Sequence, residues 1–321
     1  MIYCNELKRL SDPPPLLEDY PEFVAPLACD DRYLAPPVVL DPGADLSVRA
    51  WRYWYNARGI VEMENRLEAK ATAILTVHPW GVDDDHGLRT PEPAGCAFLC
   101  TPRKNLFVTR HMERVLNPFL RRLRDRVALV ACSMPGKEDE IRRLMYASIE
   151  TAPEQLDPDR GERLLRELFE GETFTGKPLA SEIELDPNRP VSSYMRGTPS
   201  TDAHTGTNGE RFWDLPMPVH AALDRHVSDL VFYDDEGYPK VRDYLGERGI
   251  RHVLLAGYCT DMCVKATTCG YENLSQDFNV FLVGDATMAT FPAAASPALA
   301  TRIALHNAAL WQLVTQAGWV L

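Results

Sequence analysis

One cysteine follows an apolar run in a way that could support nucleophilic chemistry. Residues 252–258 read HVLLAGY, which indicates a buried strand, and Cys263 comes shortly afterwards. We expect a tight turn and then a helix over 261–274, with Cys263 in its first turn. The free N–H groups and positive partial charge at a helix start favour the thiolate, which is the reactive form of cysteine. The same N–H groups can bind an oxyanion that forms beside the sulfur.

The same pattern also fits a structural cysteine packed behind the sheet, because cysteine is among the residue types most often buried. Local sequence leaves both interpretations of Cys263 open. Two other cysteines of this region, Cys259 and Cys269, are expected to be packing residues.

Composition limits the classes of partner. Asp and Glu outnumber Lys and Arg by 46 to 34, which gives a net charge of -12. An acidic surface repels nucleic acid and anionic membranes, so we expect neither as a partner. The 8 cysteines include no C-x-x-C pair, and this usage predicts reduced thiols in a cytoplasmic protein. The first residues do not resemble a signal peptide, and no apolar run is long enough for a membrane helix.

Short apolar runs alternate with helical patterns along most of the chain. The runs are continuous rather than alternating, as expected for strands covered on both faces, and they lie at 71–77, 127–132, 229–232, 252–258 and 279–283. Helical patterns lie at 114–126, 240–248, 261–274 and 297–316. This alternation predicts an α/β fold: a doubly wound, mostly parallel sheet of about six strands flanked by helices in a Rossmann-like three-layer sandwich.

Two segments fall outside this alternation. Residues 1–69 are predicted to be an N-terminal arm, proline-rich at first and then helical over 46–70, where aromatic and charged residues recur at helical spacing. Residues 70–321 form the predicted domain, with an insertion at about 134–217 after its second strand. Long loops of α/β folds often shape the site at the carboxyl ends of the strands.

The cysteine motif resembles that of the isochorismatase-like (cysteine hydrolase) superfamily. Residues 257–267 read GYCTDMCVKAT, and both the strand ending VGDA at 283–286 and the helix opening at Asn117-Pro118-Phe119 also match. The resemblance covers about 70–134 and 218–321. It implies that Cys263 is the nucleophile, that the Tyr258–Cys259 peptide is cis, and that N–H groups near Cys259 and Cys263 form an oxyanion hole. Relatives often form dimers or tetramers, so a homo-oligomer is expected.

Two positions depart from the family pattern. The family has an aspartate base after the first strand, where this chain has His78, and a lysine after the third strand, where this chain has Tyr233 or Asp234. A histidine can act as the base for a cysteine, and Asp234 could orient its ring, which would restore a three-part relay. The alternative is a structural His78 in a degenerate site.

No resident cofactor is expected, although zinc stays open as an alternative. Relatives similar to nicotinamidases hold zinc through an Asp-x-His pair and a further histidine after the second strand, a segment that contains no histidine here. Asp202 and His204 show the Asp-x-His spacing within the insertion. A second acidic and histidine-rich group comprises His78, Asp83, Asp84, Asp85 and His86.

These observations predict a hydrolase that cleaves a C–N bond in a small amide-like or carbamoyl-like substrate through a thioester acyl-enzyme. The alternative is a catalytically degenerate protein with a binding or scaffolding role. Vinyl-ether hydrolysis, the reaction of isochorismatase itself, is disfavoured because it depends on the acidic residue that His78 replaces.

Overall fold

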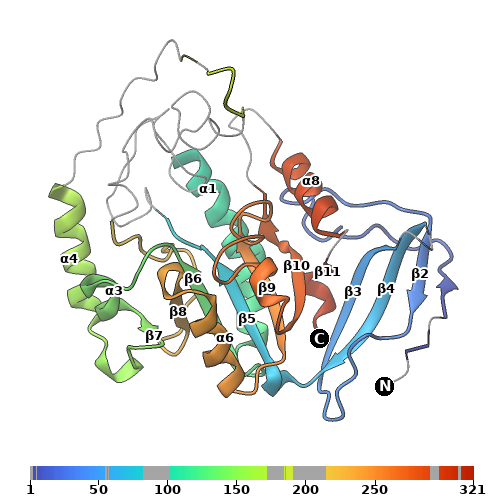
Figure 1. Ribbon diagram of the computed structural model, residues 1–321, viewed down its shortest axis with the longest axis horizontal. Helices are drawn as coiled ribbons and strands as arrows, with labels where there is room; N and C mark the ends of the chain where they lie inside the picture. The colour runs from blue at the N-terminus through green and yellow to red at the C-terminus, as the bar shows by residue number, and fades with distance from the viewer. Residues whose placement is uncertain are drawn as a thin grey trace.

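A computed structural model describes residues 3–4, 6–54, 56, 58–81, 102–171, 184, 186–190, 215–289, 296–309 and 312–321. Within these residues one mixed sheet of 11 strands has the order β1-β2-β4-β3-β11-β10-β9-β5-β6-β8-β7. Figure 1 shows this sheet running through the molecule, with α3 and α4 beyond one edge and the β2, β4 and β3 strands at the other. No helix in the described part of the chain is long and apolar enough to span a membrane.

The central strands are parallel, as the continuous apolar runs predict. They are β5 (Thr72–Val77), β6 (Leu129–Met134), β7 (Ala147–Ser148), β8 (Leu230–Tyr233), β9 (His252–Tyr258), β10 (Asn279–Met288) and β11 (Leu313–Thr315). Every residue of β5 and of β9 is buried. Strands buried on both faces need helices on both sides, and this requirement determines the layers.

Helices cover both faces of these strands. They are α1 (Pro102–His111), a π-helix (Met112–Leu116), α2 (Asn117–Leu123), α3 (Glu140–Met145), α4 (Pro158–Gly171), α6 (Tyr238–Glu247), α7 (Tyr271–Leu274) and α8 (Pro297–Ala309). On one face Ile74 of β5 packs in a core with Val115 and Phe119. On the other face Leu75 packs in a core with Leu245 and Leu305. The predicted doubly wound α/β class is therefore confirmed.

The prediction of helices over 46–70 is wrong. This segment forms β3 (Leu46–Trp54) and β4 (Gly59–Leu67), an antiparallel hairpin that joins the parallel strands through β11. The arm adds β1 (Lys8–Arg9) and β2 (Arg32–Ala35) beyond the hairpin. The sheet therefore has 11 strands in the described residues instead of six.

Cross-strand packing explains the error. Trp51 is buried in β3, where an aromatic side chain favours a pleated surface. The charged residues that suggested a helical period meet instead across strands. The carboxylate of Glu62 accepts hydrogen bonds from Nε of Arg32 at 2.5 Å and Nε of Arg49 at 2.8 Å. The C-terminal helix also ends early, at Ala309, because the chain continues as β11 beside β10.

The buried carboxylate of Glu62 makes the hairpin sensitive to one substitution. The side chain of Glu62 is fully buried, and that of Arg32 is 1% exposed. Glu62→Gln would leave the buried guanidinium without its counter-charge, so we expect the free energy of unfolding to fall by about 3–5 kcal/mol. Chemical denaturation measures this change. The matched control Glu64→Gln, at an exposed position of the same strand, should change it by less than about 0.5 kcal/mol. Equal effects at the two positions would contradict this assignment.

Candidate active site

Three side chains from distant parts of the sequence meet at the carboxyl edge of the parallel strands. His78 follows β5, Asp234 follows β8, and Cys263 lies in the turn after β9. Strand β5 lies between β9 and β6, and β8 is the next strand beyond β6. Because parallel strands end at the same edge, this order brings the three loops together.

His78 contacts both of the other residues. Its Nε2 lies 2.9 Å from Oδ2 of Asp234, and the side chain of Cys263 lies near enough to the ring to raise its pKa. A carboxylate can only accept, so Nε2 carries the proton and Nδ1 is the ring nitrogen left to receive one. The side chain of His78 is 8% exposed, whereas Cys263 is partly exposed. The purely structural interpretation requires a cysteine buried in the core, and Cys263 is not buried in this way.

The surroundings of the imidazole favour its charged form. Burial lowers the pKa of His78, but the hydrogen bonds and charges of Asp234 and Cys263 outweigh it and raise the pKa to about 9. A raised pKa means that the neighbours stabilise the imidazolium. An imidazolium beside a thiolate is a competent nucleophile pair.

The backbone around His78 and Asp234 is held in place by hydrogen bonds. His78 has φ of 46°, in the left-handed region, and its N–H donates to the carbonyl of Ser133 at 2.9 Å. Asp234 begins a short 3-10 turn, Asp234–Glu236. Its carbonyl accepts from the hydroxyl of Thr268 at 2.7 Å. Since Thr268 belongs to the turn that follows Cys263, this bond ties the aspartate loop to the cysteine turn.

The prediction of a helix over 261–274 is wrong for most of this segment. Residues 260–270 form irregular turns, and only Tyr271–Leu274 is helical. The carbonyl of Cys259 accepts from the N–H groups of Met262 and Val264, both at 3.0 Å. The carbonyl of Cys263 accepts from the hydroxyl of Thr267 at 2.8 Å, and such side-chain bonds compete with helical ones. Cys263 therefore lies in a turn and not at the start of a regular helix.

The peptide between Tyr258 and Cys259 is cis, as the resemblance implies. Gly257 immediately before it has φ of 111°, and a Cβ there would lie 2.2 Å from the carbonyl oxygen of Val77. Only glycine fits such a contact, so β9 can approach the end of β5 closely. Within the described residues no backbone hydrogen bond engages the N–H of Cys263, which leaves this donor open for an oxyanion.

Sequence reasoning missed His111, which supports this turn from the core. Its Nε2 donates to the carbonyl of Asp285 at 2.8 Å, so its Nδ1, 2.8 Å from the hydroxyl of Tyr258, accepts from that group. Burial lowers the pKa of His111 to about 4, which agrees with a neutral ring. A lone histidine in a helical pattern gives no sign of such a role, because its partners lie far along the chain.

Most residues of the two metal candidates lie outside the part of the chain that the structure describes. Within the described residues no group of three or more His, Cys, Asp or Glu side chains is arranged to hold a metal ion. Asp83, Asp84, Asp85 and His86 lie outside the described residues, as do Asp202 and His204. The zinc alternative thus stays a prediction for those segments.

The bond between His111 and Tyr258 predicts energetic coupling. We expect His111→Leu to destabilise the fold, because each lost hydrogen bond to a buried group costs about 1–3 kcal/mol. Tyr258→Phe should cost less in the His111→Leu background than alone, with a coupling energy of about 0.5–3 kcal/mol in a double-mutant cycle of denaturation experiments. His226→Leu, at an exposed histidine, is the control. Additive costs at positions 111 and 258 would refute the coupling.

Comparisons with known proteins agree with the motif. A family model described as the isochorismatase domain matches residues 201–318. Among solved structures, a cysteine hydrolase from Pseudomonas syringae pv. phaseolicola 1448A is 14% identical, with TM-score 0.41 and coverage of 78% of this chain and 91% of that one. A nicotinamidase pyrazinamidease from Acinetobacter baumanii is 14% identical, with TM-score 0.38 and coverage of 78% and 99%. A nicotinamidase from Bacillus subtilis is 14% identical, with TM-score 0.34 and coverage of 77% and 99%.

No curated protein matches the chain. The solved structures are too distant to carry an argument about activity. The family match is different, because it includes Asp234 and the whole cysteine motif with Cys263. This match confirms the resemblance to the isochorismatase-like superfamily that the motif predicted.

Proposed function

We propose that this chain is a cysteine hydrolase that cleaves the C–N bond of a small amide-like or carbamoyl-like substrate. The family match supports a hydrolase. The observation that carries the rest is the contact of His78 with both Cys263 and Asp234. A nucleophile, a base and a group that orients the base are the three parts that acyl transfer by a side chain requires.

The first half of the reaction forms a thioester. The Cys263 thiol passes its proton to Nδ1 of His78, and the sulfur attacks the substrate carbonyl carbon. Asp234 accepts a hydrogen bond from Nε2–H of His78 and stabilises the imidazolium. The oxyanion of the tetrahedral intermediate accepts hydrogen bonds from backbone N–H groups near Cys259 and Cys263. When the C–N bond breaks, the imidazolium gives its proton to the leaving nitrogen, and the amine departs.

The second half restores the enzyme. A water molecule attacks the thioester carbonyl while His78 accepts one of its protons. The C–S bond then breaks, the proton returns to the sulfur, and the carboxylic or carbamic acid leaves. The same ring nitrogen serves as base and then as acid in both halves of the reaction.

The contact also bears on the alternative role. A protein that had kept the fold and lost the chemistry would not need a histidine that interacts with both Cys263 and Asp234. Replacing the family aspartate and lysine by His78 and Asp234 preserves one base and one charged partner. The pair therefore favours an active hydrolase with exchanged residue types over a binding or scaffolding protein.

Thiol labelling tests the nucleophile without knowledge of the substrate. We expect iodoacetamide at neutral pH to modify Cys263 in the folded protein, because the imidazolium favours the thiolate. Peptide mass spectrometry gives the rate at each cysteine. In His78→Ala the rate at Cys263 should fall about tenfold or more, because the base that takes the thiol proton is removed. Cys29, which is partly exposed, is the internal control and should not change. If His78→Ala left the alkylation rate of Cys263 unchanged, the proposed pairing of His78 with Cys263 would be wrong.

Product formation tests the reaction class. With a panel of small primary amides and carbamoyl compounds, we expect release of ammonia from the wild type and none from Cys263→Ala. Hydroxylamine should trap the thioester as a hydroxamate, because it attacks the acyl-enzyme in place of water. Asp234→Asn should lower kcat by about 10³–10⁴-fold, as loss of the orienting carboxylate does in hydrolytic triads. Activity in Cys263→Ala would exclude the proposed nucleophile.

The raised pKa of His78 predicts a pH-dependent contribution to stability. The folded value of about 9 lies above the ordinary value of 6.5, so the contribution is fully present below pH 6.5 and is lost as pH rises through 9. We expect the difference in unfolding free energy between wild type and His78→Asn to shrink across this window. Urea denaturation at a series of pH values measures it. A constant difference from pH 6.5 to pH 9 would mean that the imidazolium is not stabilised.

A further inference from the structure

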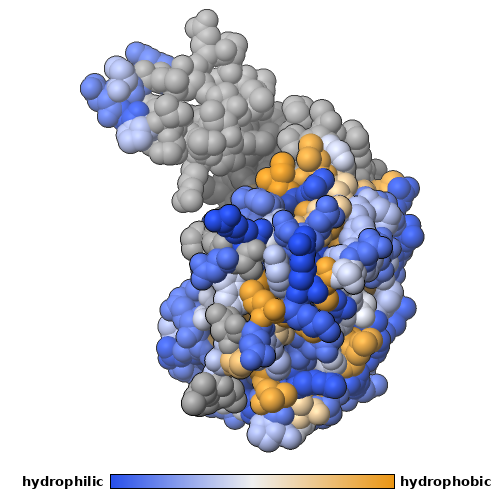
Figure 2. Space-filling model, turned by 90° about the vertical axis from the view of Figure 1, so that its right-hand side faces the viewer, coloured by the Kyte–Doolittle hydropathy of each residue, from blue (hydrophilic) through white to orange (hydrophobic). Residues whose placement is uncertain are grey.

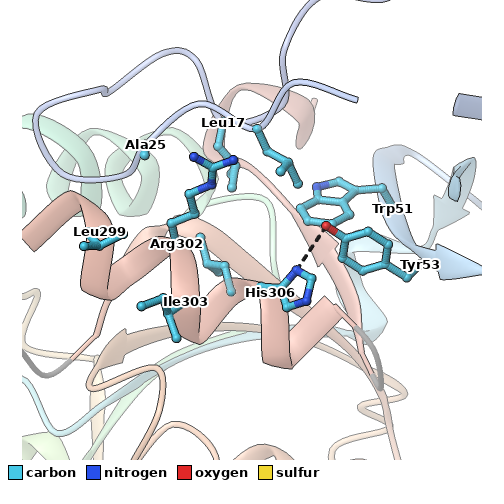
Figure 3. Close-up of a pocket in the computed structure, with 10 residues that line it drawn as sticks. Leu17, Ala25, Trp51, Tyr53, Leu299, Arg302, Ile303 and His306 are labelled. Atoms are coloured by element: carbon cyan, nitrogen blue, oxygen red, sulfur yellow. Dashed lines mark hydrogen bonds between the residues drawn. The ribbon is translucent and has the colours of Figure 1, made fainter. Parts of the chain in front are cut away.

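A cavity, separate from the cysteine site, lies between residues 17–27, the β3 strand and α8. Its volume is about 420 Å³, within the range of small-molecule sites. Figure 3 shows the cavity with α8 along one side and the β3 side chains Trp51 and Tyr53 at another. The residues that line it are Leu17, Ala25, Leu27, Trp51, Tyr53, Leu299, Arg302, Ile303, Leu305 and His306. His78, Asp234 and Cys263 are not among them.

Most of the residues that line this cavity are apolar, both in its buried part and at its rim. Leu17, Trp51 and Leu305 are 1%, 0% and 2% exposed and form its buried part. At the rim, Leu299 and Ile303 are 55% and 57% exposed. In Figure 2, which faces the side of the molecule that carries the β3–β4 hairpin, orange hydrophobic patches lie between hydrophilic residues. Exposed apolar rims around a cavity are typical of ligand-binding sites.

Polar groups are few and lie at defined places. The ring of His306 contacts the hydroxyl of Tyr53 at 3.3 Å, so these two side chains bond each other. Arg302 reaches from α8 across the cavity toward the arm, as Figure 3 shows. Among the described residues no ion pair engages Arg302, and it is the one Lys or Arg side chain among those that line the cavity.

A guanidinium that no described residue pairs with, set beside mostly apolar walls, selects a particular kind of ligand. The walls require an apolar body, and the guanidinium requires an anion. Arg binds carboxylates through two parallel hydrogen bonds. A dianion is disfavoured, because the cavity offers one cation and the protein carries a net charge of -12. A monoanionic carboxylate on an alkyl chain satisfies both requirements.

We propose that this cavity is a binding site for a medium-chain alkyl carboxylate. Its carboxylate pairs with Arg302, and its chain packs against Trp51, Leu17 and Leu305. The site is independent of the proposed hydrolase chemistry, because the two share no residue. Each methylene added to the chain should tighten binding about fourfold until the cavity is full.

Isothermal titration calorimetry with octanoate, decanoate and decanol, each below its aggregation limit, tests the site on the full chain. We expect decanoate to bind more tightly than octanoate, and decanol to bind about tenfold or more weakly than decanoate, because it cannot pair with the guanidinium. Arg302→Gln should remove this preference for decanoate while leaving decanol unchanged. The matched control Arg242→Gln, at an exposed position of α6, should bind like the wild type.

A cavity-filling variant separates this site from adsorption elsewhere. Ala25→Trp places an indole in the cavity and should abolish binding of both decanoate and decanol, with circular dichroism to verify that the variant is folded. Equal binding of decanol and decanoate, unchanged decanoate binding in Arg302→Gln, or decanoate binding retained in Ala25→Trp would each overturn the proposal. None of these measurements depends on enzymatic activity, so their failure leaves the proposed hydrolase function untouched.

Discussion

The hydrogen bond between His78 and Asp234 joins the ends of two strands that are not neighbours, because β6 lies between β5 and β8. Its geometry determines the protonation of the imidazole. Since Nε2 donates to the carboxylate, Nδ1 is the ring nitrogen that can exchange a proton with Cys263, whose side chain interacts with the ring. The bond is possible only because parallel strands end at one edge and because φ of 46° at His78 turns the chain sharply there. The proposed chemistry depends on this one contact.

The altered residue types change the charges of the site but keep a base and a charged partner for it. In the family pattern a carboxylate takes the thiol proton and a lysine supplies positive charge. In the proposed mechanism one imidazole takes both roles, because it is the base before proton transfer and the cation afterwards. An imidazole in both roles needs a carboxylate at the ring nitrogen that does not exchange the proton. Asp234 provides this carboxylate, at or next to the position where the family has lysine. The raised pKa of His78 follows from these neighbours, which outweigh the effect of burial.

Buried polar groups connect this site to the rest of the fold. His111 links the hydroxyl of Tyr258 to the carbonyl of Asp285, and the carboxylate of Asp285 accepts from the N–H of Ala317 at 2.7 Å. Burial raises the pKa of Asp285 to about 7, as expected for a carboxyl group in the core. The chain from α1 to the C-terminal segment is thus bonded to the strand that carries the cysteine turn. The N-terminal strands extend the same sheet, and β3 together with α8 lines the cavity that contains Arg302.

The sequence by itself determined the parallel core and the cysteine motif. Continuous apolar runs are intrinsic to strands buried on both faces, and the spacing of the motif around Cys263 is local. Tertiary structure alone decided the hairpin over 46–67, because Glu62 meets its arginines across strands, and the irregular turn at 260–270, where the hydroxyl of Thr267 takes a carbonyl. The family resemblance had already named His78 and Asp234 as partners of Cys263, but only tertiary structure shows the bond between them and adds His111 behind Tyr258. His78 and Asp234 are 156 positions apart, and His111 is 147 from Tyr258. Contacts over such separations depend on strand order and packing, and no local pattern encodes them.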